Sequence, residues 1–444
     1  MIALLLCAAA AAAPDARAAA ELVPASARAA LLLDGRDGAG GLRDFLTAAG
    51  AWAPLLEPRS LGRELHRSVG VDLLQADPPF LSAGPRALVV SNETWGLSAP
   101  VTDAKAARRA LEAWLAEDGP VRPTRPSPLK GPLVSANRAG MIAPVAAGLR
   151  FLTASGKHAA TLVSELAHVG PRRADTAPLS RDAALGPSLQ RPLGRAALWL
   201  RGEGPLHGAL LSLDASAHGL VARGLAISAT SAALLDGAAP GPCATSALGS
   251  LRAAPGPAGR TLAALGARQY LGQLPGGAQR DAIDKLLQRA LAGTTQGALC
   301  IDSIDVHALG DAAESLRAIH FSSAARAPDF KAAADAAGPA LISKSLCLRV
   351  KESVVRLDAP CGPPLELADA AVGEPSLLGQ VDFAAIDRVL SRMSPLDALN
   401  GSVAAGAIAA HLLWSDLFRH SGPLEVTGKP AGTSADLELK LPLH

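Results

Sequence analysis

The densest group of reactive side chains in this sequence is Cys300, Asp302, Asp305 and His307, which interrupt an otherwise apolar segment. In an extended chain Cys300 and Asp302 share one face, and Asp305 and His307 share the other. Carboxylates with an imidazole can bind a metal ion or transfer a proton. Asp302, Asp305 and His307 are therefore candidate metal ligands. The alternative is a solvated strand face, because the sequence offers no obvious further ligand and no H-E-x-x-H motif.

A second pattern, Ser127 and Lys130, has the S-x-x-K spacing of the nucleophile and lysine in penicillin-binding enzymes. Pro126 and Pro128 surround the serine, however, and the K-T-G element of those enzymes is absent. The sequence also lacks a phosphate-binding loop, a dinucleotide-binding glycine motif and a G-x-S-x-G nucleophile elbow. We therefore predict no catalytic residue and no cofactor.

Trp95 lies in a polar stretch, Ser91–Gly96, which predicts the tip of a hairpin. An exposed tryptophan at such a tip can contact a ligand or a membrane surface, whereas the alternative is burial beneath a loop. Trp95 is the candidate ligand-binding residue.

Four cysteines follow the N-terminal region: Cys243, Cys300, Cys347 and Cys361. Four cysteines permit two disulfides in three pairings. Cys347 and Cys361 are the closest in sequence and flank a predicted hairpin, so they are the first candidate pair. The alternative is that these are small, buried free thiols. The absence of a C-x-x-C motif argues against a zinc ribbon and a thioredoxin-like site.

Residues 2–13 form an apolar run of 12 residues, which is too short to span a bilayer and is typical of a signal peptide. Small-residue cleavage patterns follow, so we expect a signal peptide over residues 1–20 and a mature start near Ala19 or Glu21. Lipidation at Cys7 is disfavoured, because Leu6 stands where that pathway needs a small residue. The expected location is the periplasm or cell envelope; the alternative is a cytoplasmic protein that begins with an alanine-rich helix.

Composition excludes several classes of protein. The chain has 444 residues, of which 49% are hydrophobic and 18% charged, with a net charge of +2, so it is not intrinsically disordered. Aromatic residues make up 3% and no charged block occurs, which argues against nucleic-acid binding. No later apolar run is long enough for a transmembrane span. The longest, Val403–Trp414, predicts a buried helix instead.

The clearest predicted helix begins at Thr102 or Asp103, whose side chain can accept hydrogen bonds from the first turn. Apolar residues then recur with helical spacing up to Leu115. Two strand-like runs precede this helix, Ala87–Ser91 and a second around Leu97–Val101. The local unit is therefore two strands followed by a capped helix.

This unit recurs along the chain. Strands predicted over 298–305 and 317–322 precede Asp329–Ala333, which echoes Asp103-Ala104-Lys105-Ala106-Ala107. Looser echoes begin at Ser155 and Asp382. The sequence therefore predicts an α+β fold with two or more repeated modules of antiparallel strands followed by a capped helix.

The main domain boundary is expected near residue 195, after an irregular polar stretch. It separates an N-terminal α+β domain, residues 21–195, from a C-terminal α+β domain, residues 196–444. The second domain begins with a predicted meander and ends in a β-hairpin. In its last strand Leu437, Leu439 and Leu441 alternate with polar residues.

The layout resembles a loose group of uncharacterised exported bacterial envelope proteins. The features that carry the resemblance are the leader, Leu22-Val23-Pro24-Ala25, and the helix start Thr102-Asp103-Ala104-Lys105-Ala106. It implies an α+β envelope protein and brings no catalytic residues. We expect a non-catalytic exported protein that binds an envelope partner or an apolar ligand between modules. The alternatives are a hydrolase with an unrecognised active site and a structural subunit of an envelope assembly.

Overall fold

The structure is a computed structural model, and the chain divides into two compact units. The first unit is Met1–Arg201 with Gly208–Gly224, and the second is Gly202–His207 with Leu225–His444. The sequence predicts a boundary near residue 195. The structure describes residues 16–35, 39–74, 78–124, 131–145, 148–170, 176–243, 248–272, 281, 284–285, 288, 291–303, 319–325, 347–351, 354–359, 374–394 and 402–444.

The first unit is built on antiparallel strands, the last of which, β10, continues into residues of the second unit. They are β1 (Ala29–Leu33), β2 (Arg86–Ser91), β3 (Thr94–Pro100), β4 (Arg122–Pro123), β5 (Leu133–Val134), β6 (Arg138–Val145), β7 (Gly148–Ser155), β8 (Ala196–Arg201), β9 (Leu206–Ser216) and β10 (Gly219–Ser228). Their order across the sheet is β10-β9-β8-β1-β2-β3-β7-β6-β5-β4. The first strand in sequence, β1, therefore lies inside the sheet.

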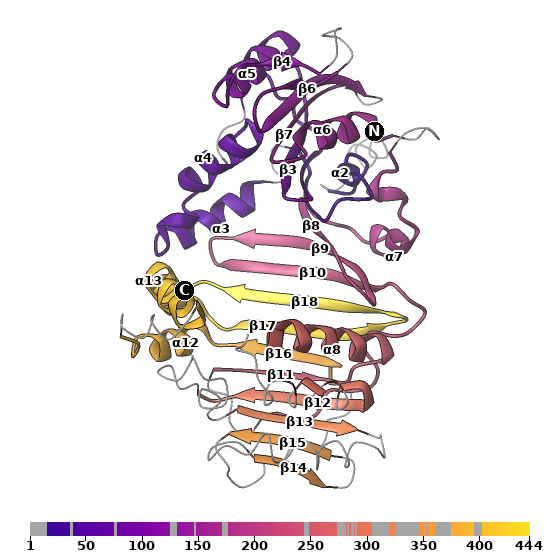
Figure 1. Cartoon of the computed structure of the whole chain (residues 1–444), viewed down its shortest axis with the longest axis vertical. Helices are drawn as coiled ribbons and strands as arrows, with labels where there is room; N and C mark the ends of the chain where they lie inside the picture. Colours follow the sequence, from indigo (N-terminus) through magenta and orange to yellow (C-terminus); the bar gives the residue numbers. More distant parts are fainter. Residues whose placement is uncertain are drawn as a thin grey trace, which may run out of the picture. The chain divides into compact units, whose positions relative to one another are not determined.

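Helices cover both faces of this sheet (Figure 1). They are α2 (Arg17–Ala20), α3 (Gly40–Gly50), α4 (Pro58–Val69), α5 (Ala104–Ala116), α6 (Ala159–His168) and α7 (Gly186–Leu189), with the short turns η2 (Pro54–Leu56), η3 (Leu179–Arg181) and η4 (Ala183–Leu185). Leu97 of β3 is buried with residues of α4 and α5. A Cβ on the preceding residue, Gly96, would lie 2.8 Å from Leu162 of α6. Successive residues of one strand thus meet helices on opposite faces.

Helix α5 begins as the sequence predicted. The Asp103 carboxylate accepts hydrogen bonds from the backbone N–H groups of Lys105 and Ala106, both at 2.9 Å. Trp114, at the end of the apolar stripe, is 1% exposed, and its indole N–H donates to the Arg67 carbonyl at 3.2 Å. The stripe therefore packs α5 on the sheet and beside α4.

Gly70 ends α4 in the left-handed conformation, with φ +78°. Its backbone N–H donates to the His66 carbonyl at 2.8 Å. The ring of Trp114 lies 3.1 Å from where a Cβ on Gly70 would sit. Glycine is favoured here by both backbone conformation and space.

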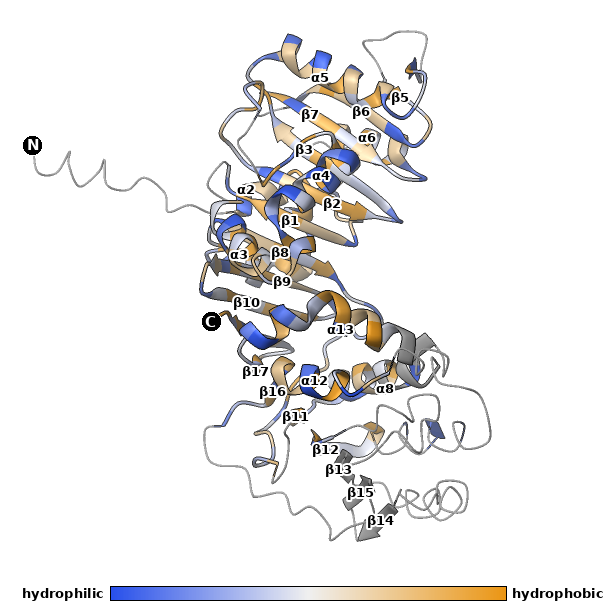
Figure 2. Ribbon diagram, turned by 90° about the vertical axis from the view of Figure 1, so that its left-hand side faces the viewer, coloured by the Kyte–Doolittle hydropathy of each residue, from blue (hydrophilic) through white to orange (hydrophobic). Residues whose placement is uncertain are grey.

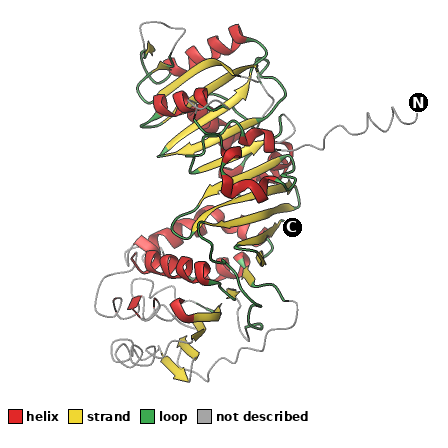
Figure 3. Ribbon diagram, turned by 90° about the vertical axis from the view of Figure 1, so that its right-hand side faces the viewer, coloured by secondary structure: helices red, strands yellow, loops and turns green. Residues whose placement is uncertain are grey.

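The strands of the second unit also pair in antiparallel order. They are β11 (Gly249–Ala253), β12 (Thr294–Ile301), β13 (Ile319–Ala325), β14 (Cys347–Lys351), β15 (Val354–Ala359), β16 (Leu377–Val381), β17 (Leu424–Ala431) and β18 (Ser434–Pro442). Their order is β18-β17-β16-β11-β12-β13-β15-β14. Among the described helices of this unit are α8 (Pro257–Gly272), α12 (Phe383–Leu390) and α13 (Ser402–His420), and Figure 3 shows helices beside the strands. The C-terminal hairpin expected from alternation is β17–β18.

The other helix starts that echo Asp103 differ from one another. Asp382 caps α12, where its Oδ1 accepts from the Ala385 N–H at 2.8 Å. Helix α6 begins after His158 without a side-chain cap. Residues 329–333 lie outside the described residues. The coarse prediction, helices with antiparallel sheet in an α+β fold, is confirmed.

The structure shows where the apolar segments of the sequence lie. The burial predicted for Val403–Trp414 is wrong in part, because Leu412 is 76% and Leu413 50% exposed on α13; Figure 2 shows hydrophobic residues along this helix. Among the described helices none is long and apolar enough to cross a membrane. Helix α2 lies within the predicted signal peptide, yet Ala19 and Ala20 are fully buried in the first unit.

Candidate functional site

Trp95 lies beside the tight turn that joins β2 to β3. Asn92 and Glu93 form this two-residue turn with φ values of 45° and 61°, the geometry that matches the twist of a hairpin. The Trp95 side chain is 44% exposed. The side chain predicted to bind a ligand is therefore accessible, and it is not covered by a loop.

Trp95 belongs to an apolar row that crosses four strands. It stands opposite Val90, Val90 stands opposite Ala29, and Ala29 stands opposite Leu200. Directly paired residues in antiparallel strands share a face. Leu200 is 42% exposed, while Val90 and Ala29 are partly buried. We call Trp95, Val90, Ala29 and Leu200 the apolar row.

The candidate metal ligands are only partly described. Asp302 follows the end of β12, whereas Asp305 and His307 lie outside the described residues. Within the residues that the structure describes, no three metal-ligating side chains come together. The metal site stays a prediction.

Cys300, next to this segment, forms a disulfide with Cys243 across a sequence separation of 57 residues. Cys300 is fully buried. This bond leaves Cys347 and Cys361 as the remaining pair. Cys347 opens β14, but its side chain and all of Cys361 lie outside the part that is described, so their pairing stays a prediction.

A buried carboxylate joins α12 to α13 in the second unit. Asp387 is 1% exposed. Its Oδ1 lies 2.9 Å from His411 Nδ1, and its Oδ2 accepts from Arg419 Nε at 2.9 Å. The rings of Phe383 and Phe418 stack nearby with centroids 5.3 Å apart. Together these contacts stabilise the packing of α12 against α13.

The electrostatics of Asp387 favour its charged form. Burial alone would raise its pKa, but hydrogen bonds from Ser415, Arg419 and His411 outweigh burial, so the pKa lies below its ordinary value. His411, Ser415 and Arg419 are spaced by four residues and share one face of α13. Sequence reasoning missed Asp387, although the four-residue spacing of its donors on α13 can be read from the sequence.

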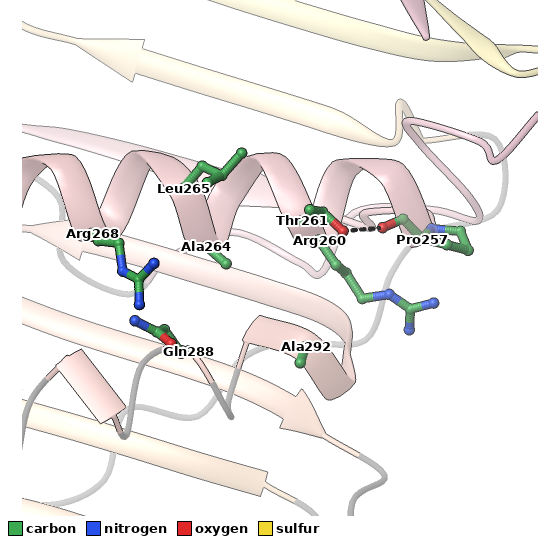
Figure 4. A pocket seen from close by; sticks show the side chains of 8 residues that line it. All are labelled: Pro257, Arg260, Thr261, Ala264, Leu265, Arg268, Gln288 and Ala292. Carbon is green, nitrogen blue, oxygen red and sulfur yellow. Dashed lines mark hydrogen bonds between the residues drawn. The ribbon is translucent and has the colours of Figure 1, made fainter. Parts of the chain in front are cut away.

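A cavity of about 400 Å³ lies against α8 in the second unit (Figure 4). Its lining residues are Pro257, Arg260, Thr261, Ala264, Leu265, Arg268, Gln288 and Ala292. The six on α8 recur every three or four residues, so they form a single stripe along the helix. Leu265 is 43% exposed. The cavity combines an apolar floor with two guanidinium groups, in the size range of small-molecule sites.

Sequence reasoning did not find this cavity. Ala264, Leu265 and Ala292 stand in no distinctive sequence pattern, and Ala292 follows Leu265 by 27 residues. The signal that was available is the pair Arg260 and Arg268 on a helix that contains no acidic residue.

No family model, no curated protein and no solved structure matches this chain.

Proposed function

We propose that this chain is a non-catalytic exported binding protein whose ligand has an apolar body that occupies the α8 cavity. The observation that carries the proposal is the lining of that cavity. Ala264 and Leu265 line it from α8, and Ala292 lines it from the segment before β12, on the side toward which Ala264 points. Contact with these side chains would remove apolar surface of a ligand from water.

Two observations support export to the periplasm or cell envelope. The apolar run over residues 2–13 has the composition of a signal peptide. The Cys243–Cys300 bond suits an oxidising compartment. Cell fractionation with mass spectrometry of the mature N-terminus tests this: we expect an envelope protein that begins at Ala19 or Glu21. An uncleaved chain confined to the cytoplasm would contradict it.

The two units are proposed to be copies of one module. Strand β1 pairs with β2 and β8, and β11 pairs with β12 and β16. Strand β2 pairs with β3, and β12 pairs with β13. Strand β3 then pairs with β7 of the hairpin β6–β7, and β13 pairs with β15 of the hairpin β14–β15. Finally β8 pairs with β9, and β16 with β17. The same sequence of pairings in both units supports duplication.

Filling the cavity tests the binding function. Titration calorimetry of the full, oxidised chain with decanoate is expected to give saturable binding. Ala264→Phe, which places a ring in the cavity, is expected to abolish it. The control is Ala263→Phe, on the exposed side of the same helix. Equal binding by both variants would contradict a ligand in this cavity.

The apolar row offers a second surface for an envelope partner, because Trp95 and Leu200 are each more than two-fifths exposed. An aromatic side chain beside aliphatic ones is typical of a contact surface. Trp95→Ser is expected to leave decanoate binding unchanged, since the row and the cavity lie in different units. Loss of decanoate binding in Trp95→Ser would contradict separate surfaces.

The alternative, a hydrolase, is favoured by one observation. His411 Nδ1 lies at hydrogen-bond distance from the Asp387 carboxylate, and within the described residues Nε2 of His411 makes no hydrogen bond. This is the orientation of a histidine that transfers protons. Hydrolysis of p-nitrophenyl acetate that is lost in His411→Ala and kept in His420→Ala would favour the hydrolase. Equal hydrolysis rates in His411→Ala and His420→Ala would argue against the hydrolase and favour the binding function.

A further inference from the structure

The α8 cavity contains two cations at its ends. Arg260 and Arg268 are eight residues apart on α8, which places their backbones about 12 Å apart along the helix. Figure 4 shows their guanidinium groups at opposite ends of the cavity, with Ala264 between them. Among the lining residues that the structure describes there is no carboxylate. The chemistry of the wall is therefore apolar in the middle and cationic at each end.

The surrounding sequence is positively charged. Residues 257–293 contain five basic and two acidic side chains, whereas the whole chain has a net charge of only +2. One of the two acidic groups, Asp284, accepts hydrogen bonds at both oxygens from Gln288 Nε2, each at 2.8 Å. The segment around the cavity thus has an excess of positive charge, which attracts anions.

The two arginines are not equally available. Arg260 donates to the Thr294 carbonyl at 3.4 Å. Arg268 is exposed, and among the described residues it makes no hydrogen bond or ion pair. A guanidinium group has five N–H donors in a planar fork that fits a carboxylate with two parallel bonds. Arg268 is therefore the better placed of the two to bind an anionic group.

We infer that the α8 cavity binds an amphiphilic monocarboxylate, with its carboxylate on Arg268 and its alkyl chain along Ala264, Leu265 and Ala292. This inference rests on the proposed function and names the class of ligand. Arg260, held at the other end by Thr294, closes the far end of the apolar floor. The head group is thus selected by charge, whereas the chain is held by contact with small apolar side chains.

Three ligands with the same alkyl chain and different head groups test the inference. Decanoate, decyl maltoside and decyltrimethylammonium are each titrated below their micellar concentrations into the full, oxidised chain. Decanoate is expected to bind at least about tenfold more tightly than decyl maltoside, the usual effect of a charge-assisted hydrogen bond. Decyltrimethylammonium is expected to bind most weakly, because its charge is repelled. Binding that is independent of the head group would overturn the inference while leaving the proposed function intact.

Removing the charge of Arg268 tests whether this side chain binds the carboxylate. Arg268→Gln is expected to weaken decanoate binding about tenfold and to leave decyl maltoside binding unchanged. Arg388→Gln removes the same charge from an exposed position on α12 and is the matched control. Equal decanoate affinities for these two variants would overturn the role of Arg268. Failure of all three ligands to bind the unmodified chain would instead remove the proposed function itself.

Discussion

Asp387 illustrates how a single residue organises its surroundings in this protein. Among the described residues it is the one buried acidic group, and it is satisfied by donors from one face of α13. A buried carboxylate without such partners would be costly. Its hydrogen bonds therefore stabilise the contact between α12 and α13 only while the carboxylate is charged.

The stability conferred by Asp387 is expected to depend on pH. Because its folded-state pKa is lowered, the stabilisation is complete above the unfolded value near about 4 and is lost as pH falls through the folded value. Asp387→Asn should lower the free energy of unfolding by about 2 kcal/mol at pH 7. The difference from the unmodified chain should shrink in acid, below the folded pKa. Urea denaturation over a pH series measures both effects.

The control for this variant is Asp416→Asn on the same helix. Asp416 has a side chain that is 70% exposed, 3.8 Å from Arg419, so its removal should change stability by less than about 0.5 kcal/mol. A loss in Asp416→Asn as large as that in Asp387→Asn would contradict the special role of the buried carboxylate.

The Cys243–Cys300 bond is expected to be a large single contribution to the stability of the second unit. It closes a loop with a separation of 57 residues, for which restriction of the unfolded chain gives about 4 kcal/mol. Cys243→Ala with Cys300→Ala should therefore lower the free energy of unfolding by roughly that amount. Peptide mapping without reductant should recover the linked pair. Recovery of both cysteines as free thiols from the exported protein would contradict the bond.

At the scale of elements, α5 shows a helix whose start and buried face follow from local sequence. Asp103 satisfies two N–H groups that the helix cannot satisfy itself. The contrast is α13, where the apolar run Val403–Trp414 predicted burial but Leu412 and Leu413 face solvent. A stripe predicts which residues share a face, whereas burial also needs an element to cover that face.

Removing the cap of α5 is expected to weaken the first unit. Asp103→Ala should lower the free energy of unfolding by about 1 kcal/mol. Lys105→Ala, an exposed substitution in the first turn, should change it by less than about 0.5 kcal/mol. Chemical denaturation of the two variants side by side measures the difference. Equal effects would show that the cap contributes nothing.

At the scale of the whole molecule, each unit has a buried cluster of its own. In the first, Leu97, Leu111 and Trp114 belong to one cluster. In the second, Leu234, Leu235 and Ala258 belong to another. Compact units that each have their own buried cluster can unfold in separate steps.

We expect two thermal unfolding transitions, which the variants above should assign. Asp103→Ala lies in the first unit and should lower the midpoint of one transition. The paired Cys243→Ala and Cys300→Ala substitutions lie in the second unit and should lower the midpoint of the other. Differential scanning calorimetry measures both. A single transition lowered by both variants would contradict independent units.

Local patterns in the sequence determined the elements whose causes are themselves local. The Asp103 cap, the stripe ending near Leu115 and the alternation in the C-terminal hairpin each depend on neighbours a few residues away. They predicted α5 and β17–β18 because capping and periodicity act over one or two turns. The turn before Trp95 was readable for the same reason.

Tertiary structure alone decided the features that join distant residues. Sheet register aligned Trp95, Val90, Ala29 and Leu200 in one row across four strands, and no local pattern encodes which strands are neighbours. Packing between segments decided that Cys300 pairs with Cys243, and that Arg268 and Ala292 line one cavity. Local sequence fixes what a segment can form, but the site depends on which segments meet, and that is settled by burial summed over the whole fold.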